Sequence, residues 1–134
     1  MKTILFLLIT LLSVSTYAKD ENKSSKPATK EQAKGFMEKT PDERAKNITD
    51  TLNEKLKLSS TQYKNIYDIN IKYAKLNDVL LNKGYSKMKL FSNLKSTNLE
   101  REKEILVLLD DKQKAIYQQE KSSMISQFKS SRKN

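Results

Sequence analysis

The sequence predicts an all-α protein, a small antiparallel helical hairpin or bundle of about four helices. Two observations favour this class. Apolar residues recur at steps of three and four from Thr40 onward, and Gly84 is the only glycine or proline after Pro41. No stretch of useful length alternates apolar and polar residues, so we expect no sheet.

Residues 1–18 have the pattern of a secretory signal peptide. Lys2 precedes an apolar run, residues 4–12, that is too short to span a bilayer, and Thr16 and Ala18 suit the minus-three and minus-one positions of a cleavage site. No Cys follows the run, which argues against a lipid-anchored lipoprotein. We therefore expect an exported protein, periplasmic in a Gram-negative bacterium or otherwise secreted, whose mature chain begins at Lys19.

The mature chain divides into a polar leader and one domain. Residues 19–39 are polar and contain Pro27 and Gly35, which predicts a disordered leader. Residues 40–134 then form a single helical domain that ends in a basic tail, without acidic residues from 121 onward.

The first two helices are predicted by their starts and their apolar faces. Thr40 caps the first helix, Pro41 suits its first position, and Glu43 completes a capping box. Its buried face is expected to hold Ala45, Ile48, Leu52 and Leu56. The stripe of the second helix is expected to hold Gln62, Ile66, Ile69, Tyr73, Leu76 and Leu80.

Two more helices follow. Gly84 favours a left-handed turn, and Ser86 is placed to cap the third helix. The apolar residues assigned to the third helix are Met88, Phe91, Leu94, Leu99, Leu106 and Leu109. The fourth helix begins at Asp110, and its apolar residues are Ile116, Tyr117, Met124 and Phe128.

Composition excludes several classes of function. The chain has no Cys and no His, which removes the commonest metal ligands and most nucleophile–base pairs. Glu100, Glu102 and Glu104 alternate and would scatter around a helix. We expect no enzyme, no cofactor and no metal site.

The net charge of +10, or +9 without Lys2 of the signal peptide, favours anionic partners: acidic protein surfaces, membrane head groups or nucleic acid. Export makes nucleic acid the least expected of these, and we predict no nucleic-acid partner. A merely solvated basic surface is the alternative explanation of the charge.

Two helix starts repeat one pattern, a leucine, a capping residue, two further residues and a glutamine. The residues are Leu58, Ser59 and Gln62 in the first copy and Leu109, Asp110 and Gln113 in the second. In each copy we expect the side chain of the capping residue to accept from the backbone N–H of the glutamine. The glutamine side chain is expected to accept in return from the backbone N–H of the capping residue. Local capping accounts for both copies, so we predict a structural role for these six residues.

The paired motif resembles the LTxxQ-motif, Spy/CpxP-like family of periplasmic chaperones, most closely its small Bacteroidetes members. The likeness covers TPDERAKNITDTLNEKL, LSSTQYKNIYDINIKYAK and KLFSNLKSTNLEREKEILVLLDDKQKAIYQQ. Ser59 replaces the usual Thr of the first motif, and Asp110–Asp111 replaces the commoner Thr-Pro of the second; both changes preserve capping.

The resemblance implies a thin, curved helical unit, often a homodimer, that binds partly unfolded proteins without ATP. It also implies, as a further role, an adaptor that restrains an envelope-stress sensor, and other members bind metal.

The segment 83–95 is the candidate surface for such clients. It interleaves basic and apolar side chains without an acid, and the candidate binding residues are Lys83, Tyr85, Lys87, Met88, Lys89 and Phe91. Charge speeds encounter, and Met and aromatic side chains adapt to varied sequences. The alternative interpretation is that Met88, Phe91 and Leu94 belong to an ordinary core and that the lysines are a solvated face.

Two other functions stay open at this point. One is a metal-responsive periplasmic sensor, which the lack of Cys and His disfavours. The other is a basic protein that contacts membrane surfaces or polyanions through the tail at 121–134. The pattern Asn47-Ile48-Thr49 matches a glycosylation acceptor, which we interpret as chance in a bacterial protein.

Overall fold

The computed structural model describes residue 35 and residues 38–131, without the side chains of residue 124 and residues 127–131. Within this part the chain forms four α-helices and no strand: α3 (Pro41–Leu56), α4 (Ser60–Leu81), α5 (Lys87–Val107) and α6 (Asp111–Ser131). The predicted all-α bundle of about four helices is confirmed. The predicted signal peptide, nearly all of the leader at 19–39, the end of the basic tail, and the side chains of Met124 and Phe128 lie outside the described residues.

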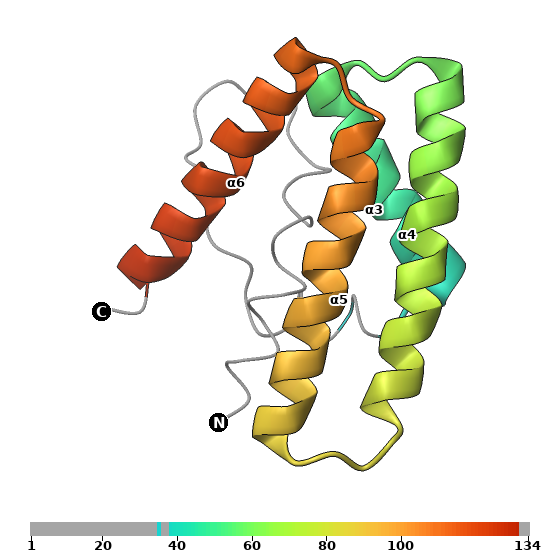
Figure 1. Cartoon of the computed structure of the whole chain (residues 1–134), viewed down its shortest axis with the longest axis vertical. Helices are drawn as coiled ribbons and strands as arrows, with labels where there is room; N and C mark the ends of the chain where they lie inside the picture. Colours follow the sequence, from blue (N-terminus) through green and yellow to red (C-terminus); the bar gives the residue numbers. More distant parts are fainter. Residues whose placement is uncertain (1–34, 36–37, 132–134) are drawn as a thin grey trace.

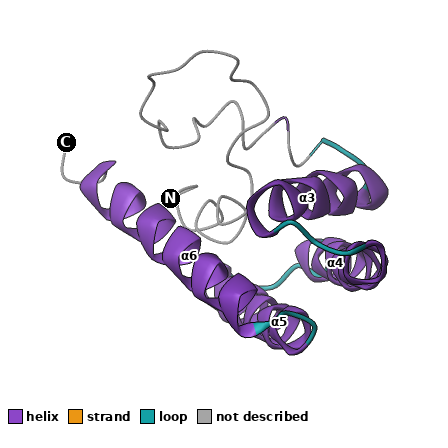
Figure 2. Ribbon diagram, turned by 90° about the horizontal axis from the view of Figure 1, so that it is seen from above, coloured by secondary structure: helices purple, strands orange, loops and turns teal. Residues whose placement is uncertain are grey.

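Along α3, α4 and α5 consecutive helices run antiparallel, and α4 packs between α3 and α5 (Figure 1). Seen from above, α4 and α5 stand side by side, whereas α6 leaves the end of α5 and extends away from the other helices (Figure 2). The first half of α6 approaches the end of α3, where Lys55 and Glu120 form an ion pair at 3.7 Å. The second half of α6 therefore projects beyond the three-helix unit.

The predicted starts of the first and third helices are confirmed by their caps. Thr40 Oγ1 accepts from the Glu43 amide at 3.2 Å, and the Glu43 carboxylate accepts from the Thr40 amide at 2.9 Å. Ser86 Oγ accepts from the Lys89 amide at 3.3 Å at the start of α5. Gly84 has φ of 68°, the left-handed conformation that glycine adopts without steric cost. These contacts span three residues or fewer, which is why the sequence predicts them.

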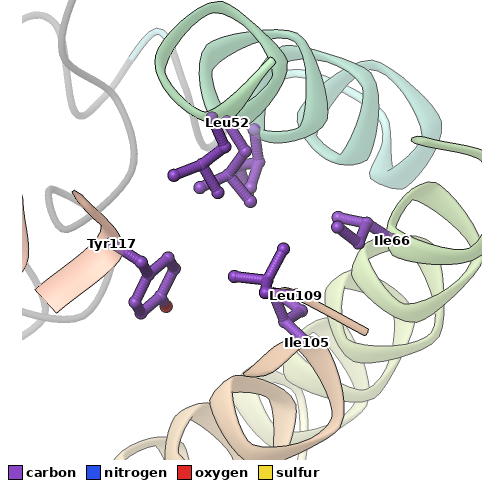
Figure 3. Packing of buried hydrophobic residues seen from close by; sticks show 7 residues of the cluster. Leu52, Ile66, Ile105, Leu109 and Tyr117 are labelled. Atoms are coloured by element: carbon purple, nitrogen blue, oxygen red, sulfur yellow. The ribbon is translucent and has the colours of Figure 1, made fainter. Parts of the chain in front are cut away.

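The apolar core gathers at the end of the bundle where the two glutamine motifs lie (Figure 3). It is formed by residues from all four helices and from the turn before α6: Ile48, Leu52, Leu56, Ile66, Ile105, Leu109 and Tyr117. Burial of each such aliphatic side chain contributes about 1.5–3 kcal/mol relative to exposure. The bundle is thus stabilised most strongly at its motif end.

Polar contacts fix the register of α3 against α4. Thr49 and Asn70 are both buried, with Asn70 Nδ2 donating to Thr49 Oγ1 at 3.0 Å and Thr49 Oγ1 donating to the Ala45 carbonyl at 2.7 Å. Nearer the core, the Tyr63 hydroxyl donates to Asp50 at 2.6 Å. The buried face of α4 therefore contains a polar residue, Asn70, that the apolar pattern does not predict.

Three apolar residues of the predicted helices do not belong to the core. Leu76, Met88 and Leu99 are exposed, and for Met88 this contradicts only the alternative interpretation as a core residue. Leu76 lies to one side because α4 presents Ile66, Asn70 and Tyr73 to its neighbours. Met88 and Leu99 lie about 120–140° around α5 from Leu94, at about 100° per residue, and so face away from α4.

Two further differences concern α5. Ile105 is fully buried in the core, although it is missing from the predicted apolar set of this helix. Leu109 is buried as predicted, but it follows the end of α5 at Val107 and belongs to the turn before α6.

Candidate functional site

Both motif copies cap their helices as predicted. Ser59 Oγ accepts from the Gln62 amide at 3.1 Å, and Gln62 Oε1 accepts from the Ser59 amide at 2.9 Å. Asp110 Oδ1 accepts from the Gln113 amide at 2.8 Å, and Gln113 Oε1 accepts from the Asp110 amide at 3.1 Å. Each copy is a capping box that satisfies two amides at a helix start.

The same two glutamines also bind each other across 51 residues of sequence. Gln62 Nε2 donates to Gln113 Oε1 at 2.8 Å, and Gln113 Nε2 donates to Gln62 Oε1 at 3.1 Å. Gln62 Nε2 also donates to the Leu108 carbonyl at 2.8 Å, and Gln113 Nε2 to the Leu56 carbonyl at 3.2 Å. We call Gln62 and Gln113 the glutamine clamp.

The glutamine clamp joins four helix ends at one place. Leu56 ends α3 and Leu108 follows α5, while Gln62 and Gln113 lie in the first turns of α4 and α6. Each glutamine side chain therefore donates to a backbone carbonyl at the end of one helix and accepts from a backbone N–H at the start of another. The interpretation of the motif as local capping alone was incomplete, because it did not include the contact between the two glutamines. The sequence feature that could have indicated this contact is a glutamine at the same position of two helix starts.

The clamp is a structural joint and not a binding surface. Gln113 is 7% exposed, and Leu109 is buried in the core. Leu58 is half-buried and packs against the same cluster. The two glutamine side chains are occupied with each other and with helix ends, which supports the structural role predicted for them.

The turn between α4 and α5 brings most of the predicted binding residues together at the opposite end of the bundle (Figure 1). We call Lys83, Tyr85, Lys87, Met88 and Lys89 the tip patch. Met88 is 85% exposed, which contradicts its interpretation as core, and the three lysines are exposed. Lys89 Nζ lies 5.9 Å from the centre of the Tyr85 ring, within the range of a cation–π contact.

Phe91, the sixth predicted binding residue, does not belong to the tip patch. It is half-buried, and it lies one turn of α5 before buried Leu94, on the side that meets the bundle. For Phe91 and Leu94 the alternative interpretation as core residues is therefore the better one.

The surroundings of the tip patch are strongly basic. No acidic residue occurs between Asp78 and Glu100, a stretch that contains Lys83, Lys87, Lys89 and Lys95. Asp78, the acid nearest the tip in α4, is neutralised because Arg44 Nη2 donates to both of its carboxylate oxygens at 2.6 Å. The tip therefore combines an exposed apolar side chain with a positive potential.

Two of the three acidic residues of α5, Glu102 and Glu104, are engaged in separate ion pairs. Glu102 accepts from Lys121 Nζ at 2.6 Å, and Glu104 accepts from Lys72 Nζ at 2.6 Å and from the Tyr73 hydroxyl at 2.7 Å. The hydrogen bond from Lys72, followed by that from Tyr73, lowers the pKa of Glu104.

In the described part of the chain no group of three or more His, Cys, Asp or Glu residues could hold a metal ion.

The predicted basic tail begins inside the fold. Lys121 is half-buried and bound to Glu102, so it serves α6 packing against α5 and is not a free cation for a membrane surface. Residues 132–134, and the side chain of Lys129, lie outside the described residues. Among the described helices none is long and apolar enough to cross a membrane.

Comparison with known proteins gives one match. Residues 18–134 match the family described as a domain of unknown function (DUF4890). A search of curated proteins and a search of solved structures found no match.

Proposed function

We propose that this chain, which belongs to the DUF4890 family, is an exported, ATP-independent chaperone or envelope-stress adaptor that binds partly unfolded proteins through its tip patch. The observation that carries the proposal is Met88: it is 85% exposed and lies between Lys87 and Lys89, in a stretch of sequence from 79 to 99 that contains no acidic residue. The resemblance to the LTxxQ-motif, Spy/CpxP-like family supports the same function. Homodimerisation and contact with a stress sensor are part of the proposal that rests on the resemblance alone.

The chemistry of the tip patch suits clients of varied sequence. The Met thioether is unbranched and polarisable, so it adapts to different apolar side chains. Lysines around it attract acidic segments and speed encounter without requiring a fixed geometry. Because Met88 lies in the first turn of α5, next to a glycine-containing turn, clients would reach it without any rearrangement of the core.

The central experiment follows aggregation of a chemically denatured client by light scattering, with the purified mature protein in several-fold excess. We expect suppression by the wild-type chain and several-fold weaker suppression by Met88→Ser. Val107→Ser is the matched control, since Val107 is 81% exposed and lies at the other end of the same helix. No suppression by the wild type, or equal loss in both variants, would contradict the proposal.

The lysines are tested separately. Replacing Lys83, Lys87 and Lys89 by glutamine is expected to slow client capture and to reduce its dependence on salt, because exposed charges act mainly on encounter and are screened by ions. Anionic liposomes test the alternative of a membrane surface. Sedimentation with liposomes that vanishes at modest salt, together with no effect on client aggregation, would favour a surface-binding protein.

Export is tested by fractionation of cells that express the full chain. Recovery outside the cytoplasm, with an N-terminus at Lys19, is the expected result. A full-length chain in the cytoplasm would contradict this part of the proposal.

A further inference from the structure

Two arginines are buried in the bundle, and they differ in one respect. Arg44 is 4% exposed and binds the Asp78 carboxylate through Nη2 at 2.6 Å. Arg101 is 8% exposed, and its Nη2 donates to the neutral side-chain oxygen of Asn98 at 2.7 Å. In both residues Nε is buried without a hydrogen-bond acceptor. The difference is that, among the described residues, Arg44 binds a carboxylate and Arg101 binds none.

The nearest carboxylate along α5 does not serve Arg101. Glu102 follows it directly, but both of its oxygens accept from Lys121 Nζ, at 2.6 and 2.8 Å. Within the described part of the chain Arg101 forms no ion pair. A guanidinium keeps its charge in proteins, so α5 holds a buried positive charge to which no carboxylate of the described residues is hydrogen-bonded. The neighbouring Glu102 charge favours it electrostatically, but both Glu102 oxygens are bound to Lys121.

A second donor without a hydrogen-bond acceptor among the described residues is Tyr117 on α6, one turn before Lys121, which binds Glu102 beside Arg101. Tyr117 is buried, and Figure 3 shows its side chain extending from α6 into the space between the helices. Its hydroxyl forms no hydrogen bond with the described residues, whereas Tyr63 and Tyr73 donate to Asp50 and Glu104. Burial raises the pKa of Tyr117 to about 12, against the opposing influence of the Arg101 charge. At neutral pH the hydroxyl therefore keeps its proton and can donate it.

We propose that Arg101, together with the Tyr117 hydroxyl, forms a binding site for a carboxylate group between α5 and α6. A carboxylate presents two coplanar oxygens, which match the forked donors of a guanidinium and leave room for a third donor such as a phenol. The site is independent of the tip patch, which lies at the other end of α5. Its ligand class is a small organic acid or the carboxylate of a longer molecule.

The direct test uses NMR of arginine side chains in the full mature protein. The chain contains only three arginines, Arg44, Arg101 and Arg132, so the Nε–Hε region holds at most three signals. Sodium acetate replaces sodium chloride at constant ionic strength, and Arg101→Gln identifies the Arg101 signal. We expect a saturable shift of that signal alone. A shift that is absent, linear in acetate, or equal for all arginines would overturn the site.

A second measurement does not depend on assigning signals. Acetate is expected to raise the melting temperature of the wild type relative to chloride, because a ligand that binds only the folded state stabilises it. The same increase should persist in Arg44→Gln and disappear in Arg101→Gln. Tyr117→Phe keeps the ring and is expected to weaken acetate affinity several-fold. An acetate effect that survives in Arg101→Gln would refute the assignment, and unchanged affinity in Tyr117→Phe would remove the hydroxyl from it.

Discussion

Truncation of Gln113 to alanine separates local capping from the glutamine clamp. The substitution removes four hydrogen bonds: those from Gln62 Nε2 and the Asp110 amide to Gln113 Oε1, and those from Gln113 Nε2 to Gln62 and Leu56. The local cap is worth about 1 kcal/mol, and each further net hydrogen bond contributes about 0.5–1.5 kcal/mol. We therefore expect a loss of about 3 kcal/mol in the free energy of unfolding, a large part of the stability of a small domain.

Glu43→Ala is the matched control for this prediction. Glu43 occupies the same position of a capping box at the start of α3, but the hydrogen bonds of its side chain reach only Thr40. The assay is urea unfolding followed by circular dichroism at 222 nm. If Gln113→Ala costs no more than Glu43→Ala, the long-range bonds contribute nothing and the reasoning is refuted.

A double-mutant cycle with Gln62→Ala measures the clamp itself. Two hydrogen bonds link the two amides directly, so we expect a coupling energy of about 1–2 kcal/mol between the substitutions. Two independent caps would give additive losses. Additivity would leave Gln62 and Gln113 as local capping residues only.

Two further predictions concern buried polar groups. The pKa of Tyr117, raised by burial from 10.0 to about 12, favours the protonated form in the folded state, so the unfolded chain releases this proton first as pH rises. The contribution of Tyr117 to the free energy of unfolding should therefore be fully present below about pH 10 and decline between about pH 10 and 12. In urea unfolding, Tyr117→Phe should reduce this decline, and an identical decline in the variant would contradict the assignment. Thr49→Val should cost about 1–3 kcal/mol because it leaves buried Asn70 Nδ2 without its acceptor, whereas Thr49→Val with Asn70→Leu should cost less than the single change; thermal unfolding that shows the double variant to be the weaker one would contradict this.

The sequence by itself determined the helices of this protein and their ends. Thr40, Ser59, Ser86 and Asp110 each cap a helix through contacts within three residues, and Gly84 alone makes the left-handed turn inexpensive. Such contacts depend on the local backbone, so a pattern of residue types predicts them. The same locality explains why the all-α class and the helix order followed from spacing and turn signals.

Only the tertiary structure decided which helix faces meet and which polar groups find partners. Gln62 and Gln113 look like two separate caps until α4 and α6 start side by side, and Met88 looks like core until the rotation of α5 turns it outward. Arg101 and Arg44 are alike in sequence terms, yet packing gives a carboxylate to one and none to the other. These outcomes depend on helix rotation and register across distant segments, where one step along a helix turns a side chain by about 100°.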